Sequence, residues 1–164
     1  MNRPDDRDHG NRLDRTLTWR LHALHKLTDV ISSRAYVAET GLSMSVGRCL
    51  TAIGTFAPLS VNDLADQANL NKGQASRAAQ ALVDAGLVKK ITNRADARGV
   101  VLTLTPRGKT TWRRAMDLVA RRNDEIFGSF SAAERTQFSA MLDRLLDQAR
   151  LQAGGDAAGA ETDE

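Results

Sequence analysis

The sequence predicts a mainly helical protein that contains one short β-hairpin, and three observations support this fold class. Apolar residues recur every three or four positions through most of the chain, as they do along one face of a helix. Residues 87–92 and 99–104 break this spacing and are rich in β-branched residues, which is typical of strands. A short join at residues 69–71 separates two short helical segments, which indicates a helix-turn-helix.

The first part of the chain predicts a flexible arm followed by two helices. Residues 1–12 are polar and lack periodicity, so we expect a flexible N-terminal arm. An apolar stripe then predicts a long helix over residues 13–38 that ends near Gly41. The stripe consists of Leu13, Leu17, Leu21, Leu24 and Ile31. Ser43 can cap a second helix, which must end before Pro58.

Two shorter helices follow. Ser60 and Asp63 have the spacing of a capping box and predict a helix over residues 61–68. Asn71 can cap the next helix, and Gly86 stands where a left-handed residue is expected beyond its end. We interpret the second of these helices as the recognition helix of a helix-turn-helix.

The remainder predicts a hairpin and two more helices. The polar residues 93–98 connect the two strands and place two arginines at the hairpin tip. Thr105 and Pro106 predict the start of a helix that runs to about Phe127. A second capping box, Ser131 with Glu134, predicts a sixth helix, and residues 153–164, rich in Gly, Ala and acids, predict a disordered acidic tail.

This order of elements is that of a winged helix-turn-helix. One helix fits the major groove of duplex DNA, and a basic hairpin can reach the neighbouring backbone or the minor groove. We therefore expect residues 41–105 to form a DNA-binding domain. Long apolar stripes at both ends of the chain exceed what one small domain can cover, so residues 13–40 and 106–150 are expected to form a helical dimerisation region.

Composition excludes several classes of protein. The chain has 164 residues, of which 41% are hydrophobic, and a single cysteine that cannot form an internal disulfide. Its longest uncharged stretch, residues 49–62, is too short and too polar to cross a bilayer, and the polar N-terminus does not resemble a signal peptide. We expect a cytoplasmic protein that does not enter a membrane.

Charge is unevenly distributed. Residues 60–114 hold ten Lys or Arg against four Asp or Glu, whereas the last residues of the chain are acidic. A basic centre predicts a polyanionic partner, although a solvated basic surface would give the same count.

Several fragments in order resemble the MarR family of bacterial transcription regulators. They are Gly41-Leu42-Ser43, Pro58 to Ala65, Ser76-Arg77 with Leu82, Gly86-Leu87-Val88, Asp96-Ala97-Arg98, and Leu104-Thr105 with Gly108. The Asp-x-Arg sequence at the hairpin tip is the most specific of them. Lys90 departs from the family pattern, which often has Arg there, and so loses bidentate hydrogen bonding.

The resemblance implies a homodimer that binds double-stranded DNA at a palindromic operator. It further implies a repressor that responds to a small-molecule effector held between the dimer arms and the winged domain. Two alternatives remain: a redox-responsive regulator that uses Cys49, and a winged-helix module that binds another protein. The sequence contains no catalytic motif, so we expect no enzyme activity and no cofactor.

Candidate DNA-binding residues follow from the chemistry of base and phosphate recognition. Gln suits adenine edges, Arg suits guanine, and the small Ser permits close approach, whereas Lys favours phosphates. Arg98 is the strongest single candidate, because a narrow minor groove attracts an inserted guanidinium. The resemblance assigns Asp96 to orienting the wing. The DNA-binding candidates are Ser60, Lys72, Gln74, Ser76, Arg77, Gln80, Lys90, Arg94 and Arg98.

Other residues carry weaker hypotheses. The candidates for an effector pocket are Trp19, His22, His25, Arg48 and Trp112, although packing at a dimer interface would explain them equally well. The two histidines lack further ligands, so no metal site is expected. Cys49 lies among apolar residues, which favours a buried, inert thiol over a redox-active one.

Overall fold

A computed structural model describes residues 12–92 and 99–159 of the chain. The structure divides into two compact units after Arg122, and each is described by itself. The predicted arm up to residue 11, the hairpin tip at 93–98 and the tail residues 160–164 lie outside the described residues.

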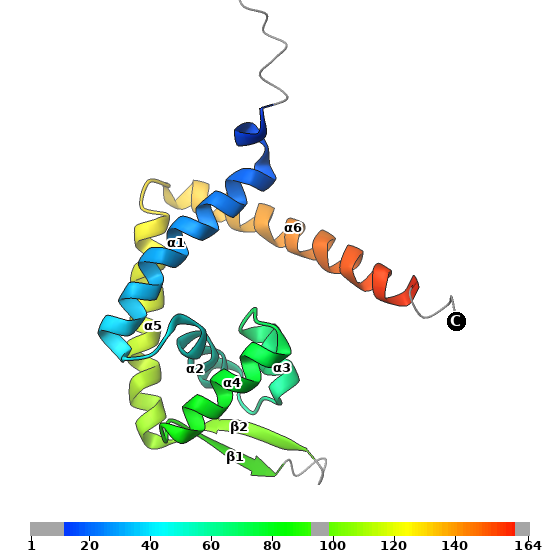
Figure 1. Ribbon diagram of the computed structural model, residues 1–164. Coiled ribbons are helices and arrows are strands. Elements are labelled where there is room, and N and C mark those ends of the chain that lie inside the picture. The colour runs from blue at the N-terminus through cyan, green and yellow to red at the C-terminus, as the bar shows by residue number, and fades with distance from the viewer. Residues whose placement is uncertain (1–11, 93–98, 160–164) are drawn as a thin grey trace, which may run out of the picture. The chain divides into compact units, whose positions relative to one another are not determined.

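The first unit contains the predicted helices and the hairpin in the expected order (Figure 1). After a 3-10 turn at Leu13–Arg15, its elements are α1 (Leu17–Thr40), α2 (Met44–Phe56), α3 (Val61–Gln67), α4 (Lys72–Asp84), β1 (Val88–Thr92), β2 (Val100–Leu104) and most of α5 (Pro106–Ile126). The mainly helical fold with a small hairpin is therefore confirmed.

Helix ends follow local hydrogen bonding. Thr16 caps α1 by accepting a hydrogen bond from the backbone N–H of Trp19, so α1 begins four residues later than predicted. The capping box predicted at Ser60 with Asp63 is present. Asn71 caps α4 as predicted, and it also forms a capping box with Gln74 that was not predicted from the sequence. Ser43 is the N-cap residue of α2, as predicted, but its side chain makes no capping hydrogen bond.

One apolar core joins α2, α3, α4 and the hairpin. Its largest completely buried side chains include Leu50, Ile53, Leu64, Leu82 and Leu102. Because these side chains come from α2, α3, α4 and β2, their burial holds the recognition helix against the hairpin.

The hairpin is anchored at both sides of its base. Its strands pair antiparallel from Val88 opposite Leu104 to Thr92 opposite Val100. The backbone of Leu59 forms an isolated bridge with Leu102, whose N–H donates to the Leu59 carbonyl at 2.8 Å. The Thr105 hydroxyl donates to the Gly86 carbonyl at 2.8 Å, so the end of α4 and the start of α5 are joined.

Helices α1 and α5 pack together through a second, smaller cluster. Tyr36 of α1 is buried with Ala115 and Leu118 of α5. An ion pair between Arg121 and Glu39 also joins these helices. Because α5 continues directly from β2, this cluster connects the winged domain to the long first helix.

The second unit consists of the end of α5, a connecting turn and α6 (Ala132–Gly159). The predicted capping box is present, since the Ser131 N–H donates to a carboxylate oxygen of Glu134 at 2.8 Å. Helix α6 continues to Gly159, so the predicted disorder of residues 153–159 is wrong. Alanine has the highest helix propensity, and alanines at 153, 157 and 158 favour continuation of the helix.

No helix among residues 12–92 and 99–159 is both long and apolar enough to span a bilayer.

Candidate nucleic-acid interface

Helix α4 has one buried and one exposed face. Ala75, Ala78, Ala79 and Leu82 pack into the core, whereas the predicted DNA-contacting residues project from the other side. Those exposed residues are Lys72, Gln74, Ser76, Arg77 and Gln80. Small alanines on the inner face let α4 approach α2 and α3 closely, which leaves its polar face accessible to a groove-sized partner.

Gln74 contributes to the start of α4 as well as to its polar face. Its backbone N–H donates to the Asn71 side chain at 2.8 Å, and its side-chain oxygen accepts from the Asn71 N–H at 3.2 Å. This reciprocal pair orients the Gln74 amide and leaves its NH₂ group as the outward donor.

A polar groove of about 320 Å³ separates the start of α2 from α4. Its lining residues are Ser45, Val46, Gln74, Arg77 and Ala78. Arg77 makes no ion pair or side-chain hydrogen bond among the described residues. The groove therefore combines an uncommitted guanidinium with a hydroxyl and an amide, a set of donors suited to a phosphate or a base edge.

Sequence reasoning did not identify Ser45. The available signal was its position two residues after Ser43, at the start of α2. Only the packing of α2 against α4 brings the Ser45 hydroxyl to the same groove as Arg77.

Gln80 and Lys90 are paired with each other. The Lys90 ammonium donates to the Gln80 side-chain oxygen at 2.8 Å, and the Gln80 amide donates to Asp84 at 2.7 Å. This chain of polar groups joins α4 to β1. It satisfies the amide at both ends, so base recognition by Gln80 would first require that it release these partners.

Ser60 has a structural role at the start of α3. Its hydroxyl accepts from the Asp63 N–H at 3.1 Å and donates to the Asp63 carboxylate at 2.8 Å. Arg94, Asp96 and Arg98, which the sequence predicts at the hairpin tip, lie outside the described residues.

The effector-pocket candidates separate into distinct environments. His25 and Arg48 converge on the Asp29 carboxylate, at 3.3 Å and 2.9 Å respectively. Trp19 and His22 are exposed on α1. Trp112 instead packs on α2, where its indole ring occupies the space that a side chain at Gly54 would need.

Tyr36 lies close enough to Arg48 for their charges to interact, and Cys49 lies in the apolar core. Burial raises the pKa of Tyr36, and the positive charge of Arg48 partly offsets this effect. Cys49 is completely buried, and burial raises the pKa of its thiol to about 11. At neutral pH about one thiol in ten thousand would be ionised, so the predicted inert cysteine is favoured over a redox-active one.

The winged domain is similar in sequence to known transcriptional regulators. Residues 40–99 match a sequence model of the MarR family. The chain is 25% identical over 112 residues to the HTH-type transcriptional regulator BilQ of Clostridium symbiosum, covering 68% of this chain and 78% of that protein. It is 26% identical over 111 residues to an HTH-type transcriptional repressor of Mycobacterium tuberculosis, covering 68% and 80% respectively.

Solved structures share the fold over most of the chain. A MarR/EmrR family regulator from Acinetobacter sp. ADP1 superposes with a TM-score of 0.78 at 24% identity, covering 85% of this chain and 99% of that one. A Mycobacterium tuberculosis MarR family protein in complex with p-aminosalicylic acid gives a TM-score of 0.64 at 25% identity, with coverage of 79% and 98%. The similarity therefore extends beyond the winged domain into the flanking helices.

Proposed function

We propose that this chain is a MarR-family transcriptional regulator, a ligand-responsive repressor that binds a palindromic operator as a homodimer. The observation that carries the proposal is the exposed polar face of α4, which is held by a buried alanine-rich face and borders the groove containing Arg77. A helix presented in this way can enter the major groove.

The chemistry of the exposed side chains supports a proposed role for each. Arg77 would donate to guanine O6 and N7 or to a phosphate, and the free NH₂ group of Gln74 would donate to a base edge. Lys72 at the start of α4 and Ser45 across the groove would bind the phosphate backbone of the DNA. We keep Arg98 as the candidate for the minor groove, with Arg94 on phosphate and Asp96 as the residue that orients the wing.

Dimerisation is supported by apolar side chains that the first unit leaves exposed on α1. Leu17, Leu21, Leu24, Leu27 and Ile31 each expose between 45% and 74% of their surface. In the second unit, α6 likewise exposes Met141, Leu145, Leu146 and Leu151. Such apolar surfaces are characteristic of subunit interfaces, and a second copy of this chain is the partner that we propose. Two-fold symmetry would then place the two α4 helices about 34 Å apart, one turn of DNA.

The proposed effector is a small aromatic acid. A relative from Mycobacterium tuberculosis forms a complex with p-aminosalicylic acid. DNA binding by a Bordetella bronchiseptica protein of the same fold is regulated by 6-hydroxynicotinic acid. In this chain Arg48 is the candidate anchor, because an effector carboxylate could replace Asp29 as its partner. The buried indole N–H of Trp112 has no hydrogen-bond partner among the described residues and could donate to a ligand.

The experiment that tests the DNA-binding proposal compares two arginine variants. Arg77→Ala should weaken binding to a duplex selected from a random pool by about 1–3 kcal/mol, roughly 5- to 150-fold, if Arg77 contacts a base edge. Arg144→Ala, which removes an exposed cation on α6, is the matched control and should bind like the wild type. Equal affinity of the Arg77→Ala variant and the wild type in a mobility-shift titration would contradict the assignment.

A further inference from the structure

Helix α5 carries a basic face outside the winged domain's predicted DNA-contacting residues. Lys109, Arg113 and Arg114 are all exposed, and we call these three side chains the α5 basic face. The opposite side of the helix is buried through Gly108, Thr111, Ala115 and Leu118. Between residues 106 and 122 the sequence contains six cations and a single acid, Asp117.

The charges of the α5 basic face are not neutralised within the described chain. None of the three side chains forms an ion pair or a hydrogen bond with the residues that the structure describes, and Asp117 forms no ion pair with either neighbouring arginine. Farther along the same helix, by contrast, Arg121 is paired with Glu39. Three unpaired cations within six residues repel one another, so an anionic partner would stabilise this surface.

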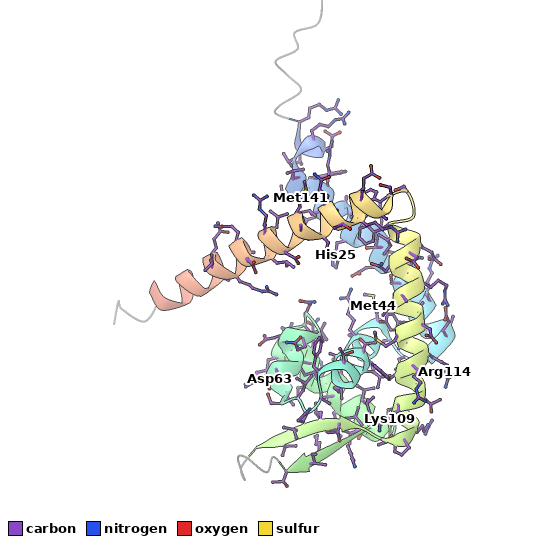
Figure 2. All side chains as sticks on the ribbon, turned by 180° about the vertical axis from the view of Figure 1, so that it is seen from behind. His25, Met44, Asp63, Lys109, Arg114 and Met141 are labelled. Atoms are coloured by element: carbon purple, nitrogen blue, oxygen red, sulfur yellow. The ribbon has the colours of Figure 1, made fainter. Side chains whose placement is uncertain are left out.

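The α5 basic face begins next to the C-terminal end of the recognition helix. The Arg107 guanidinium donates to the carbonyl of Ala85, the C-cap of α4, at 3.4 Å, and the Thr105 hydroxyl bonds to Gly86. Figure 2 shows Lys109 at the end of α5 next to the hairpin and Arg114 farther along the same helix. The cations therefore extend the basic surface of the winged domain away from α4.

The composition of this face distinguishes among polyanionic partners. A helix that binds a membrane surface inserts apolar side chains beside its cations. On α5 the apolar side chains Ala115 and Leu118 are buried in the protein core, and between Pro106 and Asp117 no large apolar side chain is exposed. A face of long basic side chains without an apolar component fits a phosphate backbone.

We propose that the α5 basic face binds the phosphate backbone of the DNA that flanks the sequence read by α4. The inference rests on the proposed function, because α4 must first position the protein on the duplex. The contacts would be independent of base sequence and would lengthen the bound segment. They would also raise the number of counterions released on binding.

The test measures the salt dependence of binding on duplexes of two lengths. The variant Lys109→Gln/Arg113→Gln/Arg114→Gln is compared with the wild type on a selected duplex of about 20 base pairs and on the same sequence extended to about 40 base pairs. A matched control, Lys26→Gln/Arg34→Gln/Arg144→Gln, removes three other exposed cations and has the same net charge. Binding to a random-sequence duplex of about 40 base pairs and to phosphatidylglycerol vesicles is measured in parallel.

For the wild type, the slope of log affinity against log salt should be steeper on the long duplex than on the short one. Because the proposed dimer carries two α5 basic faces, the α5 variant should lose up to about five units of slope on the long duplex, at about 0.9 for each phosphate contact, and the control variant should lose none. If the slope of log affinity against log salt on the long duplexes were the same for the α5 variant and the wild type, the proposal would be overturned. It would also be overturned if the α5 variant lost affinity only for the vesicles. If instead the wild type selects no sequence from the pool, the proposed function fails, whereas a slope loss on the random duplex would still support the α5 contacts.

Discussion

At Gly108 the packing requires the absence of a side chain. A Cβ atom there would lie 1.8 Å from the backbone carbonyl oxygen of Leu87, and a backbone atom cannot move aside without shifting the hairpin base. Gly108→Ala should therefore lower the free energy of unfolding by about 1–3 kcal/mol, despite the better helix propensity of alanine. Denaturant titration measures the change.

Gly73 provides the matched control for this prediction, because it also lies inside a helix. A Cβ atom at Gly73 would meet nothing closer than 3.5 Å, which is an ordinary contact. Gly73→Ala should raise the free energy of unfolding by up to about 1 kcal/mol. If both variants changed stability in the same direction, the packing argument for Gly108 would be incorrect.

Cys49 gives a prediction about pH. The thiol has a pKa of about 11 in the folded protein and 9.0 as its ordinary value, so the unfolded chain loses this proton first as the pH rises. Its contribution to stability should therefore be unchanged below about pH 9 and should decrease between about pH 9 and 11. The wild type should lose more stability across that interval than Cys49→Ala does.

Thiol reactivity provides an independent measurement of the same burial. At neutral pH the folded protein should react with a thiol reagent far more slowly than the protein in denaturant. Rapid reaction of the folded protein would contradict the burial of Cys49 and would restore the redox-responsive alternative.

At the scale of elements, the sequence predicts most of the fold because the signals are local. The capping pairs Ser60 with Asp63 and Ser131 with Glu134 mark helix starts, and β-branched residues mark the two strands. Glycine and acidic residues after residue 153 favour disorder, whereas the alanines of the same segment favour the helix that α6 continues to Gly159. Ser43 is the N-cap residue of α2 but makes no side-chain capping bond, and its hydroxyl lies 3.4 Å from that of Ser45.

The candidate site is less predictable because it depends on contacts between elements. The exposed face of α4 follows from helical periodicity, and so its residues could be chosen from the sequence. The pairing of Gln80 with Lys90 and the approach of Ser45 to Arg77 depend on how β1 and α2 pack against α4. No spacing rule within one helix or strand specifies such contacts.

The capping box at Asn71 makes a prediction about the recognition helix as an element. Asn71→Ala removes the acceptor for the Gln74 N–H and should lower the free energy of unfolding by about 1 kcal/mol. Asn71→Asp retains a capping oxygen and should remain close to the wild type. Equal destabilisation by the two variants in denaturant titrations would show that the cap does not stabilise α4.

At the scale of the whole molecule, the exposed apolar side chains of α1 predict self-association. Leu21→Glu/Leu24→Glu would place charges on the proposed interface and should convert a dimer to a monomer in sedimentation equilibrium. Val100→Glu places a charge at an exposed apolar position on the hairpin and should leave the dimer intact. If the α1 variant remained dimeric, the dimer interface would not include this part of α1.

Hydroxyl-radical footprinting on a duplex selected by the wild-type protein tests the central claim most directly. A homodimer that presents two α4 helices should protect two inverted half-sites whose centres are separated by about 10 base pairs. The Arg77→Ala variant should give weaker protection at both. A single protected half-site, or no protection at any protein concentration that leaves the protein dimeric, would contradict the account.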